Sequence, residues 1–318
     1  MECNFLEFGL HIDSSYMVLL QQDRFDDLAS RAEYRDIIPH LNYYFICRRP
    51  KITIDPKSFI FNKDHFTLDF LYQKEDKQHR IKITEKNYSG TTDLQISSKY
   101  PYDSFSISSK GEILHDGNAS LSLSLFLGNF TREILDLEVI YIGQSYAKGK
   151  RIAIDRLTNH STLQKIYFDA ISKTPDKDIF IILASFNDIQ KIVKIDGRAS
   201  TIIHNETEDI DKLKNMMFRK GIENELKESH IINFVEASLI NYFKPEYNIK
   251  LKDQFPNPNH QSYSDCYDLD LNSILVSFDT SLVKIRLYSD SVERKWQHII
   301  NYTLVNSDER KAMFDFYN

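Results

Sequence analysis

Apolar and polar residues alternate along several short segments of the first 119 residues. The alternation is clearest at residues 52–54, 66–70 and 81–83, and it is typical of strands that bury one face. Lys110-Gly111 separates two further apolar segments and is typical of a hairpin turn. We predict that residues 1–119 form a β-rich N-terminal domain with one amphipathic helix near residues 25–32.

From residue 120 the pattern changes to strand, strand, helix and strand. Residues 120–127 and 137–142 are predicted to be adjacent strands, and an amphipathic helix is predicted from about residue 155 to residue 172. Residues 178–186 form an almost continuous apolar run, which predicts a strand covered on both faces. Pro175 lies beyond the end of the predicted helix, where proline is common.

Residues 187–229 carry many charges of both signs and are predicted to contain an inserted helix near residues 209–219. A second helix follows this segment and ends before Pro245, which cannot continue it. Residues 255–264 are rich in proline and asparagine and are predicted to be an extended linker. Apolar alternation returns in the remaining residues, so the segment 255–318 is predicted to be β-rich.

Two stretches combine these patterns with residues that can do chemistry. In the first, the apolar run at residues 139–142 breaks at Gly143, and Arg156 and His160 follow near the start of a predicted helix. In the second, Glu236 lies within the apolar stripe of the later helix. A carboxylate in such a stripe is costly unless a partner, such as a metal ion, binds it.

A third motif, Pro245-x-Tyr247-Asn248, follows the helix that carries Glu236. In this order and with these gaps, the motifs resemble those of the GIY-YIG nuclease family, over roughly residues 120–250. The resemblance implies an α+β fold, in which a GIY-YIG-like nuclease domain at residues 120–254 has a small sheet with flanking helices. This domain would lie between the β-rich N-terminal domain and the β-rich C-terminal segment.

The chain departs from the family at one motif. The family has a Gly-Ile-Tyr strand shortly before its Tyr-Ile-Gly strand, and the chain has no such tripeptide there. The nearest candidate strand is residues 120–128, which alternate as a strand should but contain no tyrosine. Tyr167, on the same predicted helix face as His160, is a candidate for the second tyrosine hydroxyl.

The resemblance implies a role for each matched residue. Glu236 would bind one divalent cation, Mg²⁺ or Mn²⁺, and Arg156 would hold phosphate oxygens with its forked guanidinium. His160 would orient the leaving group or the attacking water. Tyr141 would be the general base, helped by a neighbouring cation because tyrosine titrates near 10. Asn248 would hold either the helix that carries Glu236 or a phosphate oxygen.

The net charge of the chain restricts how it could bind nucleic acid. The charge is −6 and the pI is near 5.9, whereas a broad duplex-binding face is expected to be basic. Any phosphate contact should therefore be local. The best candidate patch beside Arg156 consists of Lys148, Lys150, Arg151 and Lys165.

Composition also bears on the compartment. No apolar run approaches the roughly 18–20 residues of a membrane span, and the N-terminus lacks the pattern of a secretory signal. Cys3, Cys47 and Cys266 are few and scattered, which favours neither a disulfide framework nor a zinc site. We expect a cytoplasmic protein without a membrane partner.

The sequence thus predicts a metal-dependent endonuclease that hydrolyses phosphodiester bonds in DNA, with RNA not excluded, in restriction, defence or DNA processing. The flanking β segments would recognise the target or a protein partner. Two other readings stay open. The chain could be a nuclease-derived binding or interaction module that has lost catalysis, which the unmatched first tyrosine and the acidic charge favour. It could also be a β-rich scaffold whose motif match is accidental.

Overall fold

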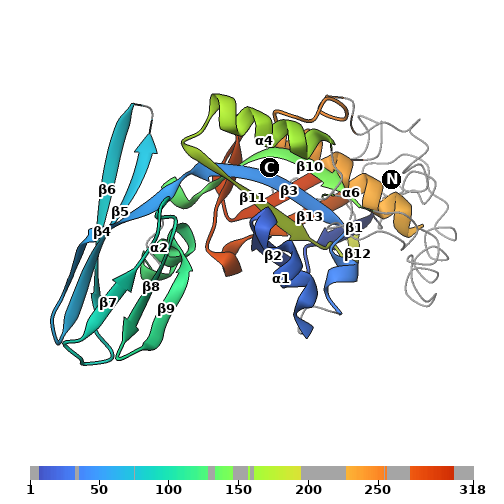
Figure 1. Ribbon diagram of the computed structural model, residues 1–318. Coiled ribbons are helices and arrows are strands. Elements are labelled where there is room, and N and C mark those ends of the chain that lie inside the picture. Colours follow the sequence, from blue (N-terminus) through green and yellow to red (C-terminus); the bar gives the residue numbers. More distant parts are fainter. Residues whose placement is uncertain are drawn as a thin grey trace, which may run out of the picture.

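The computed structural model describes residues 7–32, 36–74, 76–127, 133–145, 157, 161–194, 227–253, 255 and 273–303. These residues form a mixed α+β structure in which strands predominate. Figure 1 shows two parts. The first, here called the core, contains two larger sheets and most of the helices. The second, here called the lobe, contains two three-stranded sheets and one helix, and it extends from one end of the core.

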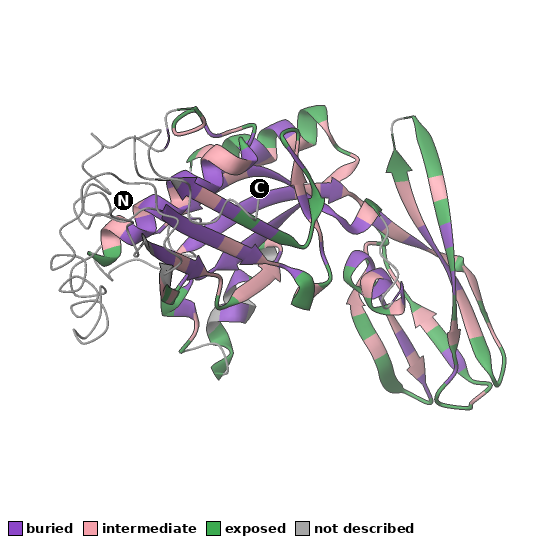
Figure 2. Ribbon diagram, turned by 180° about the vertical axis from the view of Figure 1, so that it is seen from behind, coloured by how far each residue is buried: buried purple, intermediate pink, exposed green. Residues whose placement is uncertain are grey.

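The central sheet of the core has six strands and draws on all parts of the chain. Their order across the sheet is β15 (Val292–Lys295), β14 (Leu287–Ser289), β10 (Leu137–Gln144), β3 (Tyr43–Pro50), β11 (Lys177–Ala184) and β2 (Met17–Leu20). Residues 43–47 of β3 are buried on both faces of the sheet, as expected for a central strand covered on both sides. Figure 2 shows this sheet as largely buried, whereas the lobe strands alternate between buried and exposed residues.

The second sheet of the core joins the two ends of the described chain. Its order is β12 (Asp188–Lys194), β1 (Glu7–Asp13), β13 (Ser273–Asp279) and β16 (Gln297–Thr303). β1 and β13 run parallel to each other, and the other two pairs are antiparallel. The N-terminal and C-terminal segments therefore belong to one sheet.

Helices pack on both faces of the six-stranded sheet. α4 (Ser161–Lys173) and the short α1 (Phe25–Ser30) contribute to the apolar cluster on one face of the six-stranded sheet. α6 (Glu228–Phe243) packs between the other face and the four-stranded sheet. Most of its residues are buried, as expected for a helix with apolar residues on nearly all sides. Single 3₁₀ turns lie at Gln22–Arg24, Ile38–His40, Glu133–Leu135 and Ser281–Val283.

The lobe is an insertion within a β-hairpin. It consists of β4 (Ile52–Phe61), β5 (His65–Lys74) and β6 (Lys77–Lys86), then β7 (Leu94–Ser97), β8 (Ser104–Ser109) and β9 (Glu112–Asn118), then α2 (Ala119–Leu127). It leaves the core at the end of β3 and returns at the start of β10. Because Arg48 and Glu138 are cross-strand partners, these two ends lie side by side.

A buried arginine joins the lobe to the core. Arg49 is 1% exposed, and its guanidinium donates to the carbonyl of Leu135 at 3.0 Å and to Oγ of Ser120 at 2.7 Å. The guanidinium carbon lies 4.2 Å from the centre of the Phe180 ring in the core. Burial lowers the pKa of Arg49 to about 10, so the side chain still carries its charge at neutral pH.

Several predicted elements are confirmed. The period-two segments at 52–54, 66–70 and 81–83 lie in β4, β5 and β6, and the apolar run at 178–186 contains β11. Residues 137–142 are a strand, and the described part of the predicted helix at 155–172 is helical. The helix predicted at 209–219 and the linker at 256–264 lie outside the described residues.

The strand predicted at residues 120–127 is wrong, because this segment is helix α2. Alternating serine and leucine also suits a helix, since Ala119, Leu123 and Leu127 are spaced by four and face the lobe core together. The side chain of Asn118 accepts the backbone N–H of Ser120 at 2.9 Å and so satisfies one group at the helix start. Residues 120–127 therefore cannot be the strand that neighbours Tyr141.

Strand pairing also differs from the predicted division at residues 119 and 254. β1, β2 and β3 pair with strands from the middle and the end of the chain rather than with the lobe. In the C-terminal segment, β13 pairs with β1, and β14 pairs with β10. The predicted N-terminal domain contains core strands and lobe strands that belong to different sheets.

Hydrogen bonds of two tyrosines and a histidine connect α6 to the four-stranded sheet. The hydroxyl of Tyr302 donates to the carbonyl of Ser238 at 3.0 Å. His298 is fully buried, and its Nε2 lies 3.1 Å from the carbonyl of Lys295, which requires the proton on Nε2. Nδ1 then accepts the hydroxyl of Tyr242 at 3.2 Å. Neutral histidine satisfies both contacts, and burial lowers the pKa of His298 to about 4.

We expect His298 to make the protein less stable as the pH falls from 6.5 towards 4. In this window the unfolded chain binds a proton at this histidine and the folded chain does not, so the free energy of unfolding should fall by about 3 kcal/mol. Urea unfolding at several pH values checks this. The difference in unfolding free energy between wild type and His298→Gln should shrink as the pH falls, and a constant difference would contradict the assignment.

The inserted lobe gives a second prediction. Replacing residues 51–135 with Asn-Gly, together with Arg49→Thr because the partners of Arg49 are removed, should leave a core that unfolds cooperatively. Removing residues 1–119 instead should abolish folding, because it deletes the central strand β3. Thermal unfolding followed by circular dichroism distinguishes the two. A cooperative fold from the second deletion would show that the sheet pairing described above is not required.

Candidate functional site

The strand that carries Tyr141 pairs antiparallel with β3. Tyr141 lies opposite Ile46, and Gly143 lies opposite Tyr44. The register shifts between Val139 and Tyr141, which is a β-bulge of the kind that redirects a side chain. The rings of Tyr44 and Tyr141 are 6.1 Å apart between centroids. The chain therefore places two tyrosines side by side at the end of one strand pair.

Gly143 is required by the position of the Tyr44 ring. A Cβ atom at residue 143 would overlap the phenol ring of Tyr44, including its hydroxyl. Gly143 thus gives space to the tyrosine on the neighbouring strand. Tyr44 is fully buried, whereas Tyr141 is only partly buried. Of the two hydroxyls, that of Tyr141 is better placed to meet a ligand from solvent.

Asn248 docks the end of α6 on the outer edge of β10. In the described structure β14 pairs with β10 only at residues 137 and 138. Further along, Oδ1 of Asn248 accepts the N–H of Ile142 at 2.9 Å, and Nδ2 donates to the carbonyl of Ile142 at 2.8 Å. The N–H of Tyr247 donates to the carbonyl of Ile140 at 2.9 Å. Asn248 thus holds the helix end against the strand that carries Tyr141, the first of its two expected roles.

The same turn is linked to α4. The hydroxyl of Tyr247 donates to Asp169 at 2.9 Å, and Asp169 also pairs with Lys173 at 2.9 Å. Burial and the contact with Asp169 raise the pKa of Tyr247 to about 12. Lys165, one of the predicted phosphate ligands, is exposed and lies 6.0 Å from the centre of the Tyr247 ring. A cation on α4 therefore borders the turn that holds Asn248.

Glu236 approaches the same strand ends from the other face of the sheet. It lies on α6 in a partly exposed stripe with His230 and Asn233. Nε2 of Gln144 donates to Oδ1 of Asn233 at 3.3 Å, and Gln144 is the cross-strand partner of Tyr43. Burial first, and then the negative charges of Glu236 and Glu228, raise the pKa of Tyr43 well above its ordinary value.

The paired strands β3 and β10 therefore carry candidate residues on both faces of the sheet. Tyr44, Tyr141 and Gly143 face the side covered by α4, and Tyr43 and Gln144 face α6. The structure places Tyr44 and Tyr141 side by side, and Asn248 binds Ile142, the residue after Tyr141. The charge of Glu236 acts on Tyr43, which lies on the opposite face of the sheet from Tyr141.

We tested whether these residues fit a divalent cation. The described part of the chain contains no cluster of three or more His, Cys, Asp and Glu side chains that could hold a metal. Glu236 is a single carboxylate, one turn from Asn233, which contacts Gln144. Oε1 of Gln144 and the hydroxyl of its cross-strand partner Tyr43 are buried without a hydrogen-bond partner. Mg²⁺ is often held by one or two carboxylates with water and substrate phosphates as the other ligands. This oxygen set fits Mg²⁺ or Mn²⁺.

The other expected site residues lie elsewhere or outside the described residues. Arg156, His160, Lys148, Lys150 and Arg151 are not among the residues that the structure describes.

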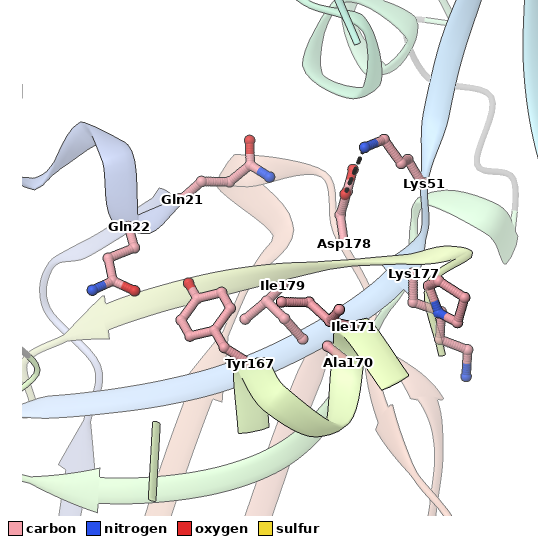
Figure 3. Close-up of a pocket in the computed structure, with 10 residues that line it drawn as sticks. Gln21, Gln22, Lys51, Tyr167, Ala170, Ile171, Lys177, Asp178 and Ile179 are labelled. Carbon is pink, nitrogen blue, oxygen red and sulfur yellow. Dashed lines mark ion pairs between the residues drawn. The ribbon is translucent and has the colours of Figure 1, made fainter. Parts of the chain in front are cut away.

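Tyr167 was expected to place a hydroxyl beside Tyr141. In the structure it lines a cleft. This cleft has a volume of about 650 Å³ and lies between α4 and β11. Figure 3 shows the Tyr167 ring extending toward Gln22. Ile179 and the ion pair of Lys51 with Asp178 also line it. Tyr141 and Tyr167 pack against the same apolar cluster on this face of the sheet, and the expected role of the Tyr167 hydroxyl beside Tyr141 stays a prediction.

The residue that the sequence did not reveal is Tyr44. It stands in Asn42-Tyr43-Tyr44, on the strand that neighbours Tyr141, where the family resemblance calls for Gly-Ile-Tyr. The lobe separates the two strands along the chain, so a search shortly before Tyr141 could not find it. The aromatic run Tyr43-Tyr44-Phe45 was the available signal.

Comparisons with family models, curated proteins and solved structures find no match. Within the described ranges, no helix has the length and apolar character needed to cross a membrane.

We expect Gly143→Ala to be destabilising because its methyl group would collide with the Tyr44 ring. Overpacking of this kind costs about 1–3 kcal/mol. Gly117→Ala is a control with a milder contact, because the new methyl would lie 3.2 Å from Oγ of Ser122 and 3.9 Å from Nε2 of His115 and would overlap no ring. Chemical unfolding measures both variants. An effect of Gly143→Ala no larger than that of Gly117→Ala would contradict the packing of Tyr44 on Gly143.

Proposed function

We propose that this chain is a GIY-YIG-like endonuclease that hydrolyses phosphodiester bonds in DNA with one divalent cation, Mg²⁺ or Mn²⁺. The observation that carries the proposal is the pairing of Tyr44 with Gly143 beside Tyr141. It supplies a tyrosine on the neighbouring strand, which is the motif that the sequence did not show. The small sheet of the family would then correspond to β10, β3 and β11, with α4 and α6 as its flanking helices.

In this proposal each residue has a role that its position supports. Tyr141 is partly exposed and would accept a proton from the attacking water, with a cation nearby to lower its pKa. Tyr44 is buried and would line the site and fix the position of Tyr141. Asn248 holds β10 and the end of α6 together through Ile142. Arg156 keeps the phosphate-binding role that the family resemblance implies, and His160 keeps the role of orienting the leaving group or the attacking water.

Glu236 would hold the cation, which when bound would polarise the phosphate and offset the charge that develops on its oxygens. The residue is partly exposed at the ends of β3 and β10, so a cation there remains open to a substrate phosphate. Lys165 is exposed on α4 and would contact the backbone of the nucleic acid. The net charge of −6 favours such local contacts over a broad basic face.

A binding module that has lost catalysis is the second candidate. Two observations favour it. Asn42 stands where the family motif begins with glycine, and Tyr44 is fully buried, so its hydroxyl is not exposed to a substrate. In this case the surface around Tyr141 would bind nucleic acid or a protein without cutting. The lobe and the C-terminal strands would then provide the recognition surfaces.

The proposal predicts three different responses to substitution. Glu236→Gln should abolish cleavage while DNA binding survives or tightens slightly, because the amide keeps the shape and removes a charge that repels phosphate. Tyr141→Phe should lower turnover by about 10²–10⁴-fold, the usual contribution of a general base, with little effect on binding. Arg156→Ala should weaken both binding and turnover, because its charge acts before and during the reaction.

The measurement is nicking of plasmid DNA with Mg²⁺ or Mn²⁺, alongside DNA and RNA binding at one fixed salt concentration. Tyr16→Phe and Asp188→Asn are control substitutions of the same kind on exposed core residues and should behave as wild type. Undiminished cleavage by Glu236→Gln would sink the mechanism. Wild type that binds nucleic acid but cuts neither DNA nor RNA with any divalent cation would leave the binding module.

A further inference from the structure

The ends of β3 and β10 form an oxygen-lined site under α6. Its members are Tyr43 on β3, Gln144 on β10, and Asn233 and Glu236 one turn apart on α6. Tyr43 and Gln144 are cross-strand partners, so both side chains project from the same face of the sheet. That face is the one covered by α6. Two strands and one helix thus contribute oxygen atoms to one small region.

Two buried polar atoms in this region point to a ligand. Tyr43 is 1% exposed, and its hydroxyl has no hydrogen-bond partner. Oε1 of Gln144 is also buried without a partner, although Nε2 of the same amide donates to Asn233. Buried polar groups are nearly always satisfied, since leaving one unpaired is costly. Two such oxygens on neighbouring strands therefore indicate that a further group binds between them.

The charge in this region identifies the kind of group. Glu236 carries the negative charge, and its field reaches the Tyr43 hydroxyl, as does that of Glu228. Amide, hydroxyl and carboxylate oxygens beside a negative charge are the donors that hard divalent cations prefer. An anion would be repelled from this region. The described residues contain no group of three or more His, Cys, Asp and Glu side chains that could hold a metal, so neutral oxygens are the candidates for additional protein ligands beside Glu236.

We propose that Gln144 is a cation ligand through Oε1, and that Asn233 is a positioning residue that holds the Gln144 amide in this orientation. The inference rests on the proposed function and deepens it, because it extends the Glu236 cation site onto the strand that carries Tyr141. Gln144 follows Gly143 directly, so a cation held by Gln144 and Glu236 is fixed relative to β10. Tyr43 closes the inner side of the site with its buried hydroxyl.

The proposal explains why α6 presents polar residues on one side only. The stripe of His230, Asn233 and Glu236 is partly exposed, whereas the apolar residues of the helix are buried between the two sheets. The Gln144–Asn233 contact ties this stripe to the end of β10, as Asn248 ties the far end of the helix to the same strand. The helix is thus attached to β10 at two points, and Glu236 lies between them in the sequence.

The test is Mn²⁺ binding to the full chain in the absence of nucleic acid, measured by isothermal titration calorimetry at fixed pH and salt. Wild type should bind one Mn²⁺, and Glu236→Gln should lose this binding. Gln144→Ala should weaken it by about tenfold or more, the usual cost of an altered metal site, and Asn233→Ala should weaken it less. Gln144→Glu should tighten it, because a carboxylate replaces a neutral oxygen at the same position.

Gln78→Glu on the exposed strand β6 adds the same charge far from the site and should leave Mn²⁺ affinity unchanged. Circular dichroism of each variant confirms folding. If Gln144→Ala and Gln144→Glu bind Mn²⁺ as wild type does while Glu236→Gln does not, the role of Gln144 is overturned and the proposed nuclease function stands. Wild type without saturable Mn²⁺ binding also overturns the inference, and plasmid nicking then decides the proposed function separately.

Discussion

The antiparallel pairing of β3 with β10 is the constraint on which the rest of the structure depends. It places Tyr44 against Gly143, sets Tyr141 beside Tyr44, and makes Tyr43 and Gln144 partners on the opposite face. A shift of one residue would exchange the two faces of β10, so that Gln144 would face α4 and Gly143 would face α6. Gly143 favours the observed register, because a residue without a side chain at this position leaves room for the Tyr44 ring.

Local patterns in the sequence were sufficient for elements but not for their partners. The period-two segments of the lobe, the buried strand β11 and the helix around Glu236 follow from side-chain spacing alone, because each pattern reports the surroundings of its own element. Residues 120–127 failed because serine and leucine in alternation suit either a strand on a half-buried sheet or a helix whose alanine and leucines recur every four residues. The burial of Ser120 and Ser122 is set by tertiary contacts with Arg49 and His115, which no local pattern contains.

The candidate site could be predicted in part for the same reason. Tyr141, Glu236 and Asn248 each stand in a recognisable local motif. The structure attaches Asn248 to Ile142 of the strand that carries Tyr141, and it attaches Asn233, one turn from Glu236, to Gln144 of the same strand. Tyr44 could not be identified, because its relation to Tyr141 exists only across two strands that the whole lobe separates in the sequence. Gln144 follows the Tyr-Ile-Gly motif directly, but only the orientation of β10 shows that it faces α6.

The position of the lobe follows from the same hairpin. The lobe joins the core where β3 ends and β10 begins, and Gly143 lies six residues further along β10, a distance of about 20 Å at the usual rise of a strand. An insertion at this end leaves the strand ends that carry Tyr44, Gly143 and Gln144 undisturbed, which explains how a hairpin can contain so large an insertion. Arg49 then fixes the lobe to the core, because its guanidinium donates to Ser120 in the lobe helix α2 and to Leu135 where the chain returns to the core, and it packs on Phe180. Tyr141 lies four residues from the start of β10, so a nucleic acid bound there would have to extend about 13 Å, or some four base pairs at about 3.4 Å each, to reach the lobe. Under the proposed function the lobe therefore acts in recognition at a distance from the cleaved bond.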